Sequence, residues 1–308
     1  MVHILSAINV VLPIFIIIFI GYLLKTKKII TDDFVSIIMK LVFNISLPSL
    51  LFLKVSQADL SLMLSASNLK LIVYCTFIIL LIYTISRFAS KRLFKDINGA
   101  FVQGSFRSNY ILIGGAILMS MFGDGATEGL AVTMVIVIPM FNILSIWVLK
   151  DKDDNMHAAI KKIITNPLIL AIFAGLIAAS IGFESPSFIN NTLRMLGNLG
   201  TPLGLIGIGS YLNLKDLAAS KPSYLAVSLK LILFPLIAII GAYLLGFDYL
   251  QMTIIYMLFG SPTAISSFIM AKTMNNHPKL AANIVIMSTA CSMLTYIIFL
   301  SVINYLFQ

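Results

Sequence analysis

The sequence predicts an all-α integral membrane protein with ten transmembrane helices, arranged as two inverted repeats of five helices each. Three observations predict this class: the composition, the lengths of the apolar stretches, and a match between the two halves of the chain. Of the 308 residues, 59% are hydrophobic and 11% are charged, and the mean hydropathy is +1.02. This composition leaves too few polar groups to cover the surface of a water-soluble domain. A soluble protein is therefore excluded.

The apolar stretches have the length of membrane-spanning helices. A helix needs roughly 20 residues to cross about 30 Å of hydrocarbon, at about 1.5 Å per residue. The first stretch is followed, not preceded, by basic residues, which distinguishes it from a secretory signal peptide. We expect spans at residues 6–24, 34–53, 69–89, 98–120, 128–149, 165–183, 188–211, 223–245, 249–271 and 281–306. No connection between them is long enough for a soluble domain.

The basic residues are distributed unequally between the two ends of these spans. Most of them, including Lys28, Lys95 and Lys152, lie beside connections that follow odd-numbered spans, whereas Lys54 and Lys70 lie near the opposite ends. By the positive-inside rule the first set of connections is cytoplasmic. We therefore expect a multi-pass protein of the cell (plasma) membrane with both termini extracytoplasmic. This asymmetry accounts for the net charge of +9, so no nucleic-acid partner is expected.

Neither the cysteines nor the acidic residues indicate a metal, a cofactor or a proton relay. Cys75 and Cys291 both lie in apolar spans, so we expect no disulfide framework and no metal cluster. The twelve Asp and Glu residues lie in connections, so no buried acidic relay is expected. Three alternatives for ion coupling fit the sequence. The first is a sodium site made of carbonyls, Asn and Ser, the second is a proton carried with the anion, and the third is transport without a coupled ion.

The two halves of the chain match when the sequence is shifted by half its length. The shift places Pro13 on Pro167, Gly21 on Gly175, Asn44 on Asn198 and Pro48 on Pro202. Each half holds five spans, and an odd number makes the second half enter the membrane from the opposite side. We therefore expect repeats at 1–154 and 155–308. Inverted repeats are typical of secondary transporters, which expose one site alternately to each side of the membrane.

Two equivalent spans are interrupted near their middle. In the span at 98–120, Arg107, Ser108 and Asn109 stand side by side within an apolar stretch, after Gly104. In the span at 249–271, Gly260 precedes Ser261 and Pro262, and proline lacks the N–H that a continuous helix needs. Non-helical backbone at this depth survives only against protein or a water-filled cavity. The amides at the start of the following half-helices carry partial positive charge, which suits a carboxylate.

The candidate site consists of polar residues at the two breaks and on the spans that face them. We expect substrate contacts from Arg107, Ser108, Asn109, Ser261, Pro262, Thr263, Ser266, Asn44 and Asn198, and helix breaks or kinks at Gly104, Gly260, Pro48 and Pro202. Arg107 supplies charge beside the substrate or braces the broken helices. Asn109 contacts the ligand or caps the backbone, and Ser266 contacts the ligand or packs. Asn44 and Asn198 line the groove that faces the transport domain or bond other helices. Lys40, Lys230 and Arg194 are expected to extend to the headgroups.

Several segments together resemble the auxin efflux carrier family, whose bacterial members include malate and other organic-anion permeases. They are SLPSLLFLKVS, SFRSNYILIGGAI, LGTPLGLIGIGSYL, SPTAISSFIMAKTMNN and IVIMSTACSML. The resemblance implies the fold of the bile-acid sodium symporters, with a scaffold of spans 1, 2, 6 and 7. Spans 3–5 and 8–10 then form a transport domain in which the fourth and ninth helices cross. Homodimers and an elevator motion are also implied. Plant-type members carry Asn where Thr263 stands, which argues against auxin itself.

These observations predict a secondary transporter that moves a small organic anion, a malate-like carboxylate, by elevator-type alternating access. The expected partners are that anion, the lipid bilayer and a second copy of the chain. An exporter of auxin-like aromatic acids and an anion channel on the same fold are the alternatives. An enzyme is not expected, because FGDGATEG at 122–129 has no second intramembrane Asp to pair with and neither H-E-x-x-H nor a P-loop occurs. A receptor is not expected, because the sequence shows no attached signalling domain.

Overall fold

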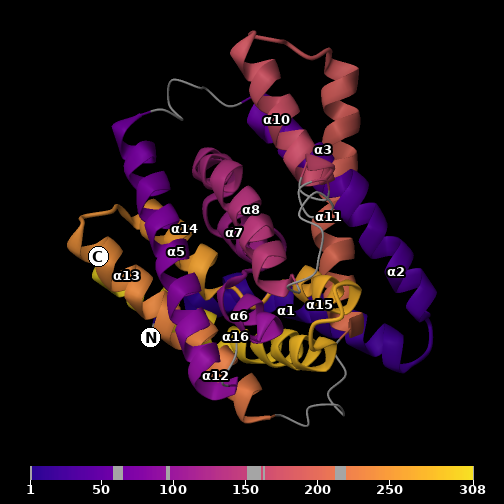
Figure 1. The fold of residues 1–308 in the computed structure, drawn as a ribbon. Coiled ribbons are helices and arrows are strands. Elements are labelled where there is room, and N and C mark those ends of the chain that lie inside the picture. Colours follow the sequence, from indigo (N-terminus) through magenta and orange to yellow (C-terminus); the bar gives the residue numbers. More distant parts are fainter. Residues whose placement is uncertain are drawn as a thin grey trace.

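The computed structural model describes residues 2–57, 65–94, 98–150, 161, 164–211 and 220–307. Within these residues the chain is helical apart from turns, short connections and one isolated β-bridge, and no strand is present. The predicted all-α class is therefore confirmed for the described part of the chain. Figure 1 shows the helices packed side by side, with the two termini near each other.

Helical segments occupy each of the ten expected ranges. The helices are α1 (Val2–Thr26), α2 (Asp32–Leu41), α3 (Leu47–Ser56), α5 (Ala66–Phe94), α6 (Gly99–Phe106), α7 (Gly115–Phe122), α8 (Thr127–Leu149), α10 (Pro167–Ser180), α11 (Ser187–Tyr211), α12 (Lys221–Ser228), α13 (Phe234–Leu244), α14 (Tyr249–Gly260), α15 (Ile265–Thr273) and α16 (Pro278–Leu306). Three π-helical segments connect some of these helices. η1 (Val42–Ser46) joins α2 to α3, η2 (Tyr110–Gly114) leads into α7, and η5 (Leu229–Leu233) joins α12 to α13. A 3-10 turn, η3 (Gly123–Ala126), precedes α8.

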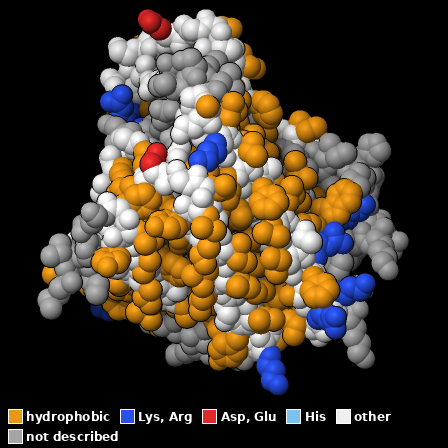
Figure 2. All heavy atoms as spheres, turned by 90° about the vertical axis from the view of Figure 1, so that its left-hand side faces the viewer, with side chains coloured by type: hydrophobic (Ala, Val, Ile, Leu, Met, Phe, Trp, Pro, Cys, Tyr) orange, Lys and Arg blue, Asp and Glu red, His pale blue; other side chains and the backbone are white. Residues whose placement is uncertain are grey.

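Several of these helices have the length and composition of membrane spans. Among the described residues, six helical stretches are long and apolar enough to cross a membrane: Ala7–Thr26, Asp32–Ser56, Ala66–Phe94, Gly129–Leu149, Lys221–Leu244 and Pro278–Leu306. Three shorter apolar stretches are Tyr110–Phe122, Pro167–Ser180 and Tyr249–Gly260. Figure 2 shows one face of the molecule covered by hydrophobic side chains, with Lys and Arg mainly at its margins. These features agree with an integral membrane protein.

Glycine sets the spacing of two helix pairs on one side of the fold. α1 packs on α11, where a Cβ at Gly21 would lie 2.2 Å from the carbonyl oxygen of Ile206. α10 packs on α3, where a Cβ at Gly175 would lie 2.9 Å from the Cβ of Val55. Small residues let helix backbones approach closely in membranes, so both pairs depend on the missing side chain. Figure 1 shows α2, α3, α10 and α11 together on this side.

The remaining helices form the other side of the fold and carry the two breaks. α5 packs against α6, α8 and α13, while α14 packs against α13 and α16. α14 ends at Gly260 and α15 begins at Ile265, so the break expected around Pro262 is confirmed. α6 ends at Phe106, and η2 begins only at Tyr110 after extended backbone at Arg107.

Two of the residues expected at breaks or kinks, Gly104 and Pro202, lie inside continuous helices. Gly104 lies inside α6 and not at the break, and a Cβ there would lie 2.9 Å from the Cδ1 of Ile284 on α16. This glycine therefore makes room for helix packing. Pro202 lies inside α11, which runs without interruption from Ser187 to Tyr211. Pro48 stands directly after η1, where the continuous helical stretch Asp32–Ser56 changes from π-helical to α-helical hydrogen bonding.

Candidate functional site

The two helix breaks contact each other in the interior of the protein. We call residues 107–109 and 261–264 the crossing. The N–H of Asn109 donates to the carbonyl of Pro262 over 2.7 Å, and Ser108 pairs with Thr263 in an antiparallel β-bridge. The hydroxyl of Thr263 donates to the carbonyl of Gly104 over 2.6 Å. Backbone groups freed by each break are thus satisfied by the other, as buried polar groups require.

Helix α16 supports the crossing from behind. The Oγ of Ser288 accepts from the N–H of Thr263 over 3.0 Å. The hydroxyl of Tyr296 donates to the Oγ of Ser261 over 2.7 Å, and that Oγ donates to the carbonyl of Met257. Sequence reasoning expected residues 261–263 to contact a substrate. The structure places them in this internal network and not on the wall of the cavity described next.

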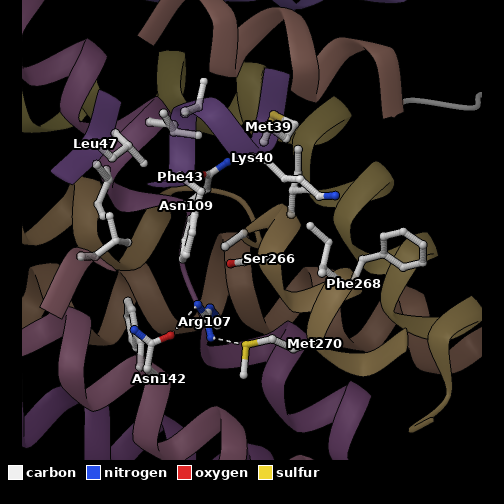
Figure 3. Close-up of a pocket in the computed structure, with 18 of the residues that line it drawn as sticks. Met39, Lys40, Phe43, Leu47, Arg107, Asn109, Asn142, Ser266, Phe268 and Met270 are labelled. Carbon is white, nitrogen blue, oxygen red and sulfur yellow. Dashed lines mark hydrogen bonds between the residues drawn. The ribbon is translucent and has the colours of Figure 1, made fainter. Parts of the chain in front are cut away.

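A cavity of about 860 Å³ lies against the other face of the crossing. Its walls come mainly from α2, η1, η2, α8 and α15 together with the crossing itself, with single residues of α3, α10 and α11. It extends to Asp32 and Lys272, which are exposed. Figure 3 shows Asn109, Ser266 and Arg107 on one part of the wall and Lys40 on another. The remaining wall is largely apolar, as in most ligand pockets, and includes Phe43, Leu47, Ile111, Leu112, Phe141 and Phe268.

Five of the expected site residues line this cavity. They are Arg107, Ser108, Asn109, Ser266 and Asn44, drawn from the crossing, α15 and η1. Asn198, which the repeat pairs with Asn44, is exposed on α11 and does not line it. Among the described residues, no group of three or more His, Cys, Asp or Glu side chains lies close enough to hold a metal ion.

Arg107 is the buried cation of the cavity, with 7% of its surface exposed. Its guanidinium donates to the Oγ of Ser145 and the Oδ1 of Asn142, each at 3.0 Å, and contacts the Sδ of Met270 at 2.9 Å. Figure 3 shows it directed between Asn142 and Met270. All three partners are neutral, so these contacts connect α8 to α15 without balancing the charge. A buried charge without a counter-charge is costly in a membrane.

Sequence reasoning did not identify the partners of Arg107. Asn142 and Ser145 stand three residues apart in the apolar stretch of α8, a spacing that places both on one helix face. Two polar side chains on one face of such a stretch are a signal that could have been used. No such signal marks Met270 in the sequence, because its sulfur comes close to Arg107 only in the folded structure.

The half-helices that follow the breaks begin without side-chain caps. Ala264 stands at the N-cap of α15 and Asn109 at that of η2, and neither side chain accepts a bond from the following turn. Side chains of Thr31, Asn98, Asn166 and Asp248 cap α2, α6, α10 and α14, whereas α8, α12 and α16 also begin without a side-chain cap. Both uncapped ends line the cavity. Such an end presents N–H groups and partial positive charge, which favour an anion.

Lys230 differs from its expected position. Sequence reasoning predicted that it reaches the headgroups, but the side chain is fully buried in η5. Its Nζ donates to the carbonyl of Phe259 near the end of α14 over 3.0 Å. Lys40 and Arg194 are exposed, and Lys40 lines the cavity. A lysine in the middle of an apolar stretch is a functional signal by default, and the sequence carries this signal at Lys230.

Comparison with known proteins identifies transporters. The family described as "Membrane transport protein" matches residues 6–300. The chain is 25% identical over 281 residues to "Uncharacterized transporter YfdV" of Escherichia coli (strain K12), covering 86% of this chain and 87% of that protein. It is 22% identical over 300 residues to "Putative malonate transporter" of Rhizobium meliloti (strain 1021), covering 93% and 92%. It is also 25% identical over 154 residues to "Probable auxin efflux carrier component 5b" of Oryza sativa subsp. japonica, covering 47% and 41%.

Proposed function

Because the chain belongs to the membrane transport protein family, we propose that it is a secondary carrier that moves a small organic anion, a malate-like carboxylate, across the membrane. Family membership confirms the resemblance to auxin efflux carriers that the sequence predicted, and the family is one of membrane transporters and not of enzymes. What we propose beyond family membership is the class of substrate and the transport mechanism.

One observation carries the choice of an anion: a buried arginine and two uncapped helix ends meet in one cavity. The N-terminal ends of α15 and η2 have no side-chain cap, and Arg107 supplies a positive charge whose hydrogen-bond partners are neutral. A bound carboxylate accepts hydrogen bonds from the amides and offsets the charge of the guanidinium. A cation would meet like charge there, and a neutral sugar would leave the charge unbalanced.

The size and walls of the cavity fit a small organic acid. Its volume, about 860 Å³, lies within the range of ligand pockets, roughly 300–1,000 Å³, and exceeds the needs of a dicarboxylate alone. The relative from Rhizobium meliloti is described as a malonate transporter, which supports a short dicarboxylate. The aromatic side chains Phe43, Phe141 and Phe268 favour a second candidate, an aromatic acid of the auxin type.

For the architecture we propose ten transmembrane helices in two inverted repeats, residues 1–154 and 155–308. Two relationships support this. Gly21 and Gly175, which coincide under the shift, each sit at a close helix contact, α1 on α11 and α10 on α3. These two contacts exchange when the repeats exchange. In addition, the paired residues Ser108 and Thr263 lie 263 − 108 = 155 positions apart, close to the shift of half the chain.

For the mechanism we propose an elevator motion between a scaffold of spans 1, 2, 6 and 7 and a transport domain of spans 3–5 and 8–10. The cavity supports this division, because α2 and η1 face the crossing across it. It reaches the surface at Asp32 and Lys272, on the side that the basic residues mark as cytoplasmic. The structure then corresponds to an inward-open state, with both termini outside, in a homodimer of the plasma membrane.

The experiment that tests this function is counterflow in proteoliposomes. Vesicles loaded with unlabelled malate, malonate, succinate or indole-3-acetate are given the same acid in labelled form, and empty liposomes serve as the control. We expect transient accumulation for at least one acid. Counterflow of amines with none of the carboxylates would contradict the proposal. Single-channel currents carried by the anion in planar bilayers would favour the channel alternative.

A further inference from the structure

Lys230 carries a second charge in the interior, apart from the cavity. The side chain is fully buried and does not line the cavity that holds Arg107 and Asn109. It lies in η5, a segment that packs against α6, α14 and α16, the helices that build and support the crossing. A fully buried lysine is expensive to maintain, so its position calls for a specific interaction.

The interaction is with the C-terminal end of a broken helix. Phe259 is the last but one residue of α14, and its carbonyl accepts the bond from the Nζ of Lys230 at 3.0 Å. The last carbonyls of any helix lack intrahelical partners and carry partial negative charge. At a membrane surface, water and headgroups satisfy them. At the crossing, this end of α14 is buried, because residues 257–259 have no exposed surface and Gly260 is buried.

The other broken helix also ends beside a buried cation, although the guanidinium of this cation bonds side chains of α8 and α15 and not the end of the helix. α6 also ends at the crossing, and Arg107 follows its last residue directly. Each of the two half-helices that end at the crossing therefore has one buried cation of the chain beside or on its C-terminal end. In carriers with broken helices, unwound carbonyls and half-helix C-terminal ends are the groups that coordinate co-transported cations. Here lysine already bonds one of those groups.

We propose that Lys230 is a tethered cation that neutralises the C-terminal end of α14 in place of a cation bound from solution, so that transport needs no sodium. The inference rests on the proposed carrier function. Lys230 is a positioning residue in this account. It acts through the carbonyl of Phe259 to hold the end of α14, and the break at residues 261–264 follows directly from that end. Its ammonium group moves with the crossing and is not exchanged during transport.

The first test uses the unmodified protein. Counterflow of the acid that is transported fastest is measured in sodium chloride and in choline chloride of equal concentration. We expect the same rate in both. A rate that falls at least about tenfold without sodium would overturn the inference, even if carboxylate transport itself is established. If no carboxylate is transported in either salt, the proposed function fails instead, so the two failures are distinguishable.

The second test replaces the tethered charge with a free one. Lys230→Ala removes three methylene groups and the ammonium, which n-propylammonium matches in length. We expect at least about tenfold slower counterflow, because a charged hydrogen bond to a buried carbonyl is lost. Added n-propylammonium should restore the rate in a concentration-dependent manner, whereas 1-propanol should not. Equal rescue by 1-propanol, or no rescue by either compound, would mean that Lys230 acts by packing alone.

A matched control exists at another helix end. Lys70 donates to the carbonyl of Leu245, at the C-terminal end of α13, over 2.6 Å, but it is exposed. Lys70→Ala should therefore transport at the wild-type rate and show no response to n-propylammonium. If Lys230→Ala is not monodisperse in detergent, Lys230→Met, which keeps most of the side-chain volume, is tested in the same way. Wild-type counterflow by Lys230→Met would overturn the inference.

Discussion

The backbone N–H of Asn109 donates to the carbonyl of Pro262 over 2.7 Å, although 153 positions separate them in the chain (262 − 109). This bond joins the break after α6 to the break after α14. It uses the N–H of Asn109 but leaves its side chain on the wall of the cavity. The two breaks are therefore bonded to each other, and the side of this unit that lines the cavity is available to a substrate.

Thr263→Val should weaken the crossing. The substitution keeps the shape of the side chain but removes the donor to the carbonyl of Gly104, leaving a buried acceptor without its partner. We expect a cost of about 1–3 kcal/mol, seen as a lower apparent melting temperature in detergent. Thr192→Val is the control, since the hydroxyl of Thr192 bonds the carbonyl of Phe188 on an exposed helix face. An equal shift for both variants would refute the role of the crossing bond.

Asn109→Ala should reduce substrate affinity with little effect on folding. Its amide lies on the cavity wall, 7% exposed, and loss of one buried hydrogen bond to the ligand costs about 1–3 kcal/mol, or about 5- to 150-fold in Kd. Asn198→Ala, on the exposed face of α11, should bind like the wild type. The affinities are measured by competition against the labelled acid. Comparable losses in the two variants would remove Asn109 from the site.

Substitutions of Arg107 distinguish the effect of its charge on substrate binding from its structural role in joining α8 to α15. Arg107→Lys keeps the charge but loses the planar guanidinium, so affinity should fall while selectivity for anions persists, and Arg107→Ala should reduce binding further. Asn142→Ala removes one brace, the acceptor at 3.0 Å, and leaves the charge. It should lower the melting temperature more than the affinity. If Arg107→Ala is monodisperse and binds the acid with wild-type affinity, Arg107 serves only as a brace.

Much of this site could be predicted from residue types and spacing. Proline within an apolar stretch and three polar residues side by side marked both breaks, because backbone hydrogen bonding restricts where a membrane helix can end. The sequence also placed Arg107, Ser108, Asn109, Ser266 and Asn44 together, and all five line the cavity.

The remaining features depend on tertiary contacts that no local pattern contains. Ser261 and Thr263 were expected to bind substrate, but they bond Tyr296 and Gly104, which lie far away in sequence. Gly104 was placed at the break because it precedes the polar residues 107–109, yet it serves the contact with α16. Lys230 was predicted to reach the headgroups. Its actual partner could not be predicted, because only the fold shows that the end of α14 lies beside it.

The proposed repeat predicts parallel effects at two glycines. Gly21→Ala places a methyl group against the backbone oxygen of Ile206, and Gly175→Ala places one against Val55. Overpacking costs typically about 1–3 kcal/mol, and Gly21→Ala should be the more severe because a backbone atom cannot rotate away. Gly125→Ala, with nothing within 4 Å of its Cβ, is the control. Apparent melting temperatures provide the measurement, and no change for Gly21→Ala would contradict the close contact of α1 with α11.

The most direct test of the account is the position of a bound acid, determined by crystallography with bromosuccinate and the anomalous signal of bromine. The account predicts a bromine peak inside the cavity, with a carboxylate beside the Asn109 side chain and the first amides of α15 near Ser266, within reach of Arg107. A peak outside the cavity, in crystals of a protein that shows carboxylate counterflow, would contradict the assignment of the crossing as the substrate site.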